Sequence, residues 1–282
     1  MNILNYCIEN TEKITNFNQK GFLWRKRFNR TPFNTIEDFN RLLIDKTIPN
    51  ELNREHIVDA FNSGEFYKGY ILAMLWGGIS TLPRKDTDEI IKKELSSAFR
   101  AFNVNKEEVE STLNLVKQHI SEGKYQNAYV LLSETNKIPG VDVSFFTKLL
   151  FFISESLNKN KLLIYDKWTK VIHLKLLLES NEKEKIEKYF GNNYFYKFFK
   201  IETSKITTNL IYVKNEFAFE AYMDYCDKMK QLSTEISNLL ETQLNSGQIE
   251  AFIFGNPLKG KKNQTNDNPR HWIRNSVINK CK

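Results

Sequence analysis

Two residues, Lys148 and Asp166, have side chains whose chemistry could be used together on one electrophilic carbon. Lys148 ends the stretch IPGVDVSFFTK at residues 138–148, and Asp166 follows eighteen positions later in LLIYDKW. The amine of a neutral lysine is a nucleophile, and a carboxylate can stabilise a developing positive charge or accept a proton. Each residue also has an ordinary structural interpretation, because lysine is common on surfaces and aspartate is a common helix N-cap.

The stretch before Lys148 predicts two helices joined by a tight connection. Pro139 and Gly140 interrupt a helical pattern, and a second helix starts after Asp142. We place this hairpin at residues 125–157, with its connection at 136–142. Amides at the start of a helix form a site for an anion such as phosphate, and glycine lets a backbone pass close to another molecule. Pro-Gly junctions also occur in helical proteins that bind no phosphate.

The helix that carries Lys148 has two unlike faces. Its apolar residues fill one broad arc in projection: Phe145, Phe146, Leu149, Leu150, Phe152 and Ile153. The opposite arc holds Ser144, Thr147, Lys148, Ser154 and Glu155, with Phe151 among them. We therefore expect Lys148 on the face that points away from the core, and we expect Asp142 to cap the helix from within the turn.

The elements around the hairpin also have helical periodicity, so the sequence predicts an all-α protein of two lobes. Glycine and proline are scarce, at 11 and 6 residues, as expected for long helices. A strand is predicted only at 205–214, where an extended loop is equally possible. Residues 1–255 form the predicted body, and 256–282 form a basic tail that we expect to be poorly ordered without a partner. Helices are predicted at 34–44, 65–78, 84–102, 106–120, 124–135, 167–190 and 215–244.

Composition excludes several classes of function. The formal charge is +7, which is compatible with an anionic partner. The three cysteines and four histidines are scattered without metal-ligand spacing, so neither a metal nor another cofactor is indicated. No signal peptide or apolar run of membrane-spanning length is recognisable, and we expect a soluble, cytoplasmic protein. Phosphate-binding loops, dinucleotide motifs, metalloprotease motifs and nucleophile elbows are also missing from the sequence.

The stretch IPGVDVSFFTKLLFF…LLIYDKW resembles the signature of helix-hairpin-helix DNA glycosylases. It is most similar to the prokaryotic branch described as 8-oxoguanine DNA glycosylase-like, which includes antiviral enzymes. The similarity covers residues 125–180. Weaker similarity is found at 70–78, which includes LAMLWGG, and at 247–255, within the stretch GQIEAFIFGN. Better-known members have Gly-Val-Gly where this chain has Asp142 in place of the second glycine. Lys148 also follows the glycine at a longer distance than in the 8-oxoguanine enzymes.

The resemblance implies an enzyme that flips a modified base out of double-stranded DNA and excises it, leaving an abasic site. Asp166 would stabilise positive charge on the sugar and help to deprotonate the nucleophile. Lys148 would attack C1′ and form a Schiff base, which would add AP-lyase activity; otherwise water is the nucleophile. The hairpin residues implied to contact DNA are Gly140, Val141, Val143, Ser144 and Thr147.

Further contacts are expected around these residues. Trp76, Phe151 and Trp168 could line a pocket for the base, although ordinary core packing is the commoner role of such side chains. Basic residues that could contact phosphates, or simply be solvated, lie in WRKRFNR from Trp24 to Arg30 and at Lys259, Lys261, Lys262, Arg270 and Arg274.

Four functions remain open from the sequence. The favoured one is defence against phage, by removal of glucosylated hydroxymethylcytosine from phage DNA, because the hairpin departs from that of the repair enzymes. The first alternative is excision repair of the 8-oxoguanine type. The second is a helix-hairpin-helix protein that binds DNA without catalysis, and a helical scaffold for protein partners is a further possibility. Only the last predicts no salt-sensitive affinity for DNA.

Overall fold

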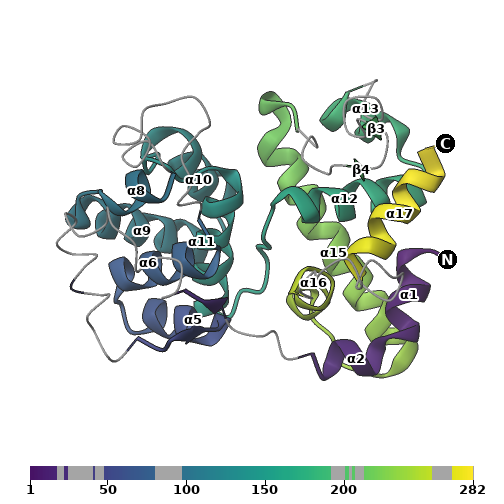
Figure 1. The fold of residues 1–282 in the computed structure, drawn as a ribbon, viewed down its shortest axis with the longest axis horizontal. Coiled ribbons are helices and arrows are strands. Elements are labelled where there is room, and N and C mark those ends of the chain that lie inside the picture. Colours follow the sequence, from purple (N-terminus) through teal and green to yellow (C-terminus); the bar gives the residue numbers. More distant parts are fainter. Residues whose placement is uncertain are drawn as a thin grey trace. The chain divides into compact units, whose positions relative to one another are not determined.

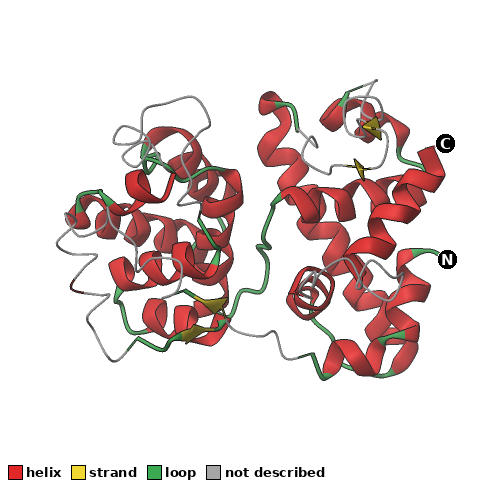
Figure 2. Cartoon of the chain, viewed as in Figure 1, coloured by secondary structure: helices red, strands yellow, loops and turns green. Residues whose placement is uncertain are grey.

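The chain is predominantly helical in the part that the structure describes. This computed structural model describes residues 1–17, 22–24, 41, 48–79, 97–191, 201–202, 205–206, 213–255 and 269–281. Figure 2 shows helices joined by loops, with only short strands beside them. The strands form two antiparallel pairs: β1 (Phe22–Leu23) with β2 (Glu51–Leu52), and β3 (Ile201–Glu202) with β4 (Lys205–Ile206). The predicted all-α fold class is confirmed.

The chain divides into two compact units that do not follow a single cut in the sequence. Unit 1 combines Met1–Gln19 with Asn160–Lys282, and unit 2 is Lys20–Lys159. Lys148 therefore belongs to unit 2 and Asp166 to unit 1.

Unit 2 is built around the helix that carries Lys148. In Figure 1 its helices cluster around α11, and α5, α6 and α9 pack directly against that helix. Nearly every residue of α6 is buried, because its sequence YILAMLW is apolar on all sides. The elements of unit 2 are α5 (Arg54–Asn62), α6 (Phe66–Trp76), α8 (Ser97–Phe102), α9 (Lys106–Ser121), α10 (Tyr125–Val130), the π-helix η2 (Leu131–Thr135) and α11 (Val143–Ser156).

Unit 1 is organised around the helix that Asp166 begins, α12 (Lys167–Glu179). This helix contacts α13, α15, α16 and α17 (Figure 1). The N-terminal helix belongs to the same unit, because the Ile3 amide donates to the Glu179 carboxylate at 3.0 Å. The other elements are α1 (Ile3–Glu9), α2 (Thr11–Thr15), α13 (Lys183–Phe190), η3 (Asn215–Phe217), α15 (Ala218–Leu240), α16 (Ser246–Gly255) and α17 (Pro269–Cys281).

Most helices predicted from periodicity are present. The segments at 65–78, 106–120, 167–190 and 215–244 contain α6, α9, α12 with α13, and α15. The segment at 124–135 forms α10 and then continues as a π-helix, which the pattern did not indicate. The predicted helix at 34–44, apart from Arg41, most of the one at 84–102 and most of the strand candidate at 205–214 lie outside the described residues.

The expectation of a poorly ordered basic tail is wrong for residues 269–281. These residues form α17, which packs against α12 and α16. Proline is favoured in the first turn of a helix, where Pro269 lies. Ile273 and Val277 are four residues apart, so they share one face of α17, and both are buried. Among the described residues, no helix has both the length and the apolar character needed to cross a bilayer.

Candidate active site

Asp166 is the N-cap of α12. Its Oδ1 accepts hydrogen bonds from the Trp168 and Thr169 amides at 2.7 and 3.2 Å. In return the Asp166 amide donates to Thr169 Oγ1 at 2.7 Å, which completes a capping box. The capping interpretation of this aspartate is therefore confirmed. The cap fixes the carboxylate at the positive end of a helix, where a negative charge is favoured.

The two oxygens of the Asp166 carboxylate are used differently. Oδ1 receives both amides, whereas no hydrogen bond from any described residue reaches Oδ2. The residue as a whole is 8% exposed. A carboxylate of this kind is held rigidly by one oxygen and can present the other oxygen to a bound molecule.

Arg270 and Trp168 lie around Asp166 in unit 1. The Arg270 guanidinium lies 5.4 Å from the Trp168 ring centroid and 4.8 Å from that of Phe254. Burial lowers the pKa of Arg270, and the nearby Asp166 carboxylate acts in the opposite direction. Trp168 is half-buried. The predicted pocket residue Trp168 and the predicted phosphate contact Arg270 are thus neighbours beside the start of α12.

Lys148 is buried in unit 2, with 4% of its surface exposed. Its Nζ donates to the Ser144 carbonyl and lies 4.8 Å from the centroid of the Phe145 ring. Its aliphatic stem passes Gly77, where an added Cβ would come within 3.0 Å of Lys148 Cδ. The expectation that this face of the helix points away from the core is wrong for Thr147, Lys148, Phe151 and Ser154, which are all buried. The reason is that α5, α6 and α9 together cover both arcs of α11.

Trp76 and Phe151, the other two residues predicted to line a base pocket, lie together in unit 2. The Arg54 guanidinium lies 5.5 Å from the Trp76 centroid and 4.7 Å from the Phe151 centroid. Trp76 also packs edge-on against Phe152. Phe151 is only 1% exposed, so its ring serves mainly as core. The three predicted pocket residues are therefore divided between the units, with Trp168 in unit 1.

The hairpin connection is shaped by contacts within unit 2. Gly140 has a φ of +77°, and an added Cβ would lie 2.4 Å from the Ser97 carbonyl oxygen. The close approach that requires glycine is therefore to α8 of the same chain. Asp142 caps α11 by accepting from the Ser144 amide at 3.0 Å, as predicted. Among the described residues, no acceptor is bonded to the amides of Gly140, Asp142 and Val143.

The predicted DNA-contacting side chains of the hairpin differ in exposure. Val141 and Thr147 are buried, and the Thr147 hydroxyl donates to the Val143 carbonyl at 2.7 Å. Gly140, Val143 and Ser144 are partly exposed. The Ser144 amide and hydroxyl both donate to Asp142 Oδ1, at 3.0 and 2.7 Å. Any phosphate contact would therefore be made chiefly by the other backbone amides of the hairpin.

A cavity of about 650 Å³ lies beside the hairpin connection in unit 2. It is bounded by the connection from Thr135 to Pro139 and by residues 103–112, which include the start of α9. Lys148, Trp76 and Phe151 do not line it. This cavity is therefore separate from the unit 2 side chains that the sequence predicts to be catalytic or to line a base pocket.

Other predicted basic contacts can be placed only in part. Trp24 is buried, and its indole donates to the Pro49 carbonyl at 2.7 Å. The rest of the 24–30 cluster and Lys259, Lys261 and Lys262 lie outside the described residues, and Arg274 belongs to α17. The described residues contain no group of three or more His, Cys, Asp or Glu side chains able to hold a metal ion.

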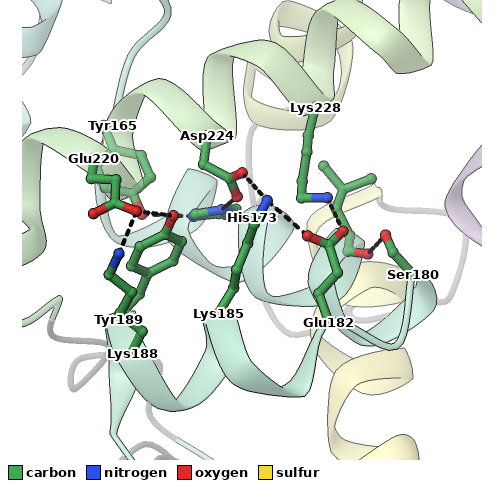
Figure 3. A network of polar contacts seen from close by, with 11 residues as sticks. Tyr165, His173, Ser180, Glu182, Lys185, Lys188, Tyr189, Glu220, Asp224 and Lys228 are labelled. Atoms are coloured by element: carbon green, nitrogen blue, oxygen red, sulfur yellow. Dashed lines mark hydrogen bonds and ion pairs between the residues drawn. The ribbon is translucent and has the colours of Figure 1, made fainter.

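A buried polar network begins at the residue before Asp166 (Figure 3). The Tyr165 hydroxyl lies 2.8 Å from His173 Nδ1, and His173 Nε2 lies 2.9 Å from the Asp224 carboxylate. Asp224 also accepts from Lys185 at 2.6 Å. Because a carboxylate only accepts, a neutral His173 carries its proton on Nε2 and accepts the Tyr165 hydroxyl at Nδ1. Sequence reasoning missed this network, since a lone histidine gives no signal of its partners.

Two pKa shifts describe the electrostatics of the network. Burial lowers the pKa of His173, although the Asp224 carboxylate opposes that effect. Burial alone would raise the pKa of Asp224, but hydrogen bonds from His173 and Lys185 outweigh it, and the net shift is downward. The network therefore favours a neutral imidazole beside an ionised carboxylate.

Comparison with known proteins identifies the family. The model of the family described as "Putative 8-oxoguanine DNA glycosylase OGG-like protein" matches residues 15–254. No curated protein and no solved structure matches the chain. The matched region contains α11, Asp166 and nearly all of α16, whereas α17 lies beyond it. Because the match covers most of the chain, this protein belongs to the OGG-like DNA glycosylase family.

Proposed function

We propose that this protein is a DNA N-glycosylase that excises a modified base and leaves an abasic site. The observation that carries the proposal is the Asp166 carboxylate, which is fixed through Oδ1 at the start of α12 while Oδ2 receives no hydrogen bond from the described residues. Membership of the OGG-like family supplies the substrate class, DNA. The target base is flipped out of the duplex before reaction, since the sugar carbon is inaccessible within the stack.

Asp166 acts on the sugar. As the bond from C1′ to the base nitrogen breaks, positive charge develops on the sugar, and a fixed carboxylate stabilises that charge. In hydrolysis, water adds its oxygen to C1′, and the proton it loses is carried away by Asp166 and finally by the departing base. The cap prevents the carboxylate from reorienting during this step, so the stabilisation is already in place when the charge forms.

Lys148 is the proposed amine nucleophile. Its attack on C1′ would form a carbon–nitrogen bond, expel the base and lead to an imine, from which strand cleavage follows. Its burial against Phe145 and Gly77 supports this role, because water is largely excluded from the amine. Borohydride reduces such an imine to a stable amine, so a covalent protein–DNA adduct that is lost in Lys148→Ala would identify this nucleophile. Base release without an adduct would identify water instead.

The hairpin is the proposed binding site for the DNA backbone. The amides of Gly140, Asp142 and Val143 are available to a phosphate at the positive end of α11. The Asp142 charge opposes this binding, so the hairpin is expected to bind less tightly than one with glycine there.

For the substrate we propose glucosylated hydroxymethylcytosine in phage DNA, and thus a role in antiviral defence. The support is the departure from the Gly-Val-Gly hairpin and the longer spacing from Gly140 to Lys148. A second candidate, 8-oxoguanine, is favoured by the description of the family.

The two candidate substrates are distinguished by base release. Purified protein is incubated with DNA carrying glucosylated hydroxymethylcytosine and, separately, with a duplex containing 8-oxoguanine, and free base and abasic sites are measured. Release from the first substrate alone supports defence, and release from the second alone supports repair. Salt-sensitive binding to both DNAs without release would favour the non-catalytic DNA-binding alternative.

A further inference from the structure

The five residues that lead into α12 form a buried segment without regular structure. Leu162, Leu163, Ile164 and Tyr165 are each exposed by no more than 1%, and Asp166 follows them. Buried backbone groups need hydrogen-bond partners, and an irregular segment cannot provide them for itself. The hydrogen-bond partners of this segment are side chains of helices. Those helices therefore determine the path of the chain into Asp166.

Glu250 holds the middle of the segment. Its Oε2 accepts the Ile164 amide at 3.0 Å, two residues before Asp166. Glu250 lies on α16 and is fully buried, and the Tyr225 hydroxyl also approaches the same oxygen at 3.4 Å. Burying a carboxylate is costly unless hydrogen bonds compensate for the lost water. The burial of this carboxylate therefore indicates that its oxygens have a specific role as hydrogen-bond acceptors.

The neighbouring residues of the segment are held in the same manner. The Tyr222 hydroxyl on α15 donates to the Leu163 carbonyl at 2.9 Å. The Tyr165 side chain is fixed at its hydroxyl by His173, as Figure 3 shows. Three consecutive residues before Asp166 thus each have an anchor on a different helix: α15, α16 or α12.

We propose that Glu250 is a positioning residue for the Asp166 carboxylate. The inference rests on the proposed function. It assigns a role to the GQIEAFIFGN stretch, which contains neither of the proposed catalytic residues. Consecutive residues in an extended chain are separated by about 3.3 Å, so a shift at Ile164 reaches Asp166 through a single intervening residue. Misplacement of a catalytic group by about 1 Å can reduce a reaction rate about 100-fold.

The test compares Glu250→Ala with Glu250→Gln. Alanine removes the acceptor of the Ile164 amide, whereas the glutamine carbonyl oxygen can still accept it. We expect single-turnover base excision by Glu250→Ala to fall about 10- to 100-fold with an unchanged Kd for DNA. Glu250→Gln should recover most of the rate. Amide hydrogen exchange at residues 162–169 should accelerate in the alanine variant and remain near wild type in the glutamine variant.

Glu179 provides the matched control. It is also a carboxylate of unit 1 that accepts a backbone amide, that of Ile3, and it pairs with Lys175 at 2.6 Å. Glu179→Ala should lower thermal stability while leaving the excision rate of the folded protein unchanged. If Glu250→Ala does not fold, Tyr222→Phe tests the same segment through Leu163, with an expected several-fold loss of rate.

The outcomes separate this inference from the function on which it rests. A wild-type protein that releases no base from either DNA would overturn the proposed function, and the positioning role with it. An active wild type whose Glu250→Ala variant keeps the full rate, or loses no more rate than Glu179→Ala at equal stability, would overturn the positioning role alone. Unchanged amide exchange in Glu250→Ala would overturn it independently of activity.

Discussion

Asp142 and Asp166 occupy the same position at the starts of α11 and α12, yet we assign them opposite relations to DNA. Asp142 accepts one backbone amide of the first helical turn, and Asp166 accepts two. Asp166 is proposed to face the sugar, where positive charge develops and a negative charge helps. Asp142 is proposed to lie beside a phosphate, where its charge opposes binding.

Asp142→Asn should therefore strengthen DNA binding. Asparagine is about as good an N-cap as aspartate, so the melting temperature should stay near that of wild type. Removing one charge next to a phosphate should raise affinity about two- to fivefold at low salt. The measurement is a titration with unmodified duplex at several salt concentrations. Asp59→Asn, on an exposed position of α5, changes net charge equally and serves as the control. Equal gains in both variants would mean that Asp142 is not near a phosphate.

His173 should make the stability of unit 1 depend on pH. Its folded-state pKa lies below the ordinary value of 6.5, chiefly because it is buried. As the pH falls, this histidine therefore takes up a proton in the unfolded chain before it does so in the folded protein. Its contribution to the free energy of unfolding is complete above pH 6.5 and is lost as the pH falls below that value. The free energy of unfolding should decrease between pH 7 and pH 5, and His173 can contribute a slope of at most about 1.4 kcal/mol per pH unit.

Denaturant unfolding at closely spaced pH values measures this contribution. Asp224 and Glu182 have lowered pKa values, so they protonate mainly below this window. His173→Gln removes the titrating group, and its profile between pH 7 and pH 5 should be flatter than that of wild type. Parallel profiles for the two proteins would contradict the assignment to His173.

Residue-scale prediction from sequence succeeded where the cause is local and failed where it is not. The two aspartate caps were predictable because an N-cap depends on the next three residues. Lys148 was expected on an exposed face, since a helix projection cannot reveal that other helices cover both sides. Glu250 was missed, although one acid within the apolar stretch IEAFIF is a signal of a buried, partnered carboxylate.

At the scale of elements, the hairpin connection depends on one close contact with α8. Gly140 and Gly123 have nearly the same positive φ, at +77° and +76°, but only Gly140 has neighbours within reach of an added Cβ. The pair therefore separates the cost of backbone strain from the cost of a steric clash.

Gly140→Ala should destabilise the protein more than Gly123→Ala. Alanine at a positive φ costs about 1–2 kcal/mol at either position. At Gly140 the clash with the Ser97 carbonyl should add about 1–3 kcal/mol. Denaturant unfolding of both variants gives the difference. Equal losses would contradict the close packing of the connection on α8.

Periodicity predicted most of the helices but not the tail helix. Segments such as 106–120 have a regular apolar stripe and a cap, and these local features suffice for α9. Residues 269–281 are basic and only weakly patterned, so α17 could not be distinguished from a disordered tail. Its order depends on packing against α12 and α16, which a single sequence does not encode in a local pattern.

At the scale of the whole molecule, the two units divide the proposed chemistry. The chain begins in unit 1, builds unit 2 and then returns to unit 1 at Asn160. Two lobes were predicted, but the return of the N-terminal helix to the later unit was not, since that pairing depends on contacts between residues more than 170 positions apart, such as Ile3 with Glu179.

The most direct test of the proposed glycosylase activity is the rate at which Asp166→Asn forms abasic sites. Asparagine preserves the N-cap of α12 and removes only the negative charge, so folding and DNA affinity should be retained. Asp142→Asn makes the same chemical change at the other capping aspartate and serves as the matched control. We expect base release by Asp166→Asn to fall at least about 100-fold, whereas Asp142→Asn should stay active. Base release at the wild-type rate by Asp166→Asn would contradict the proposed role of the Asp166 carboxylate.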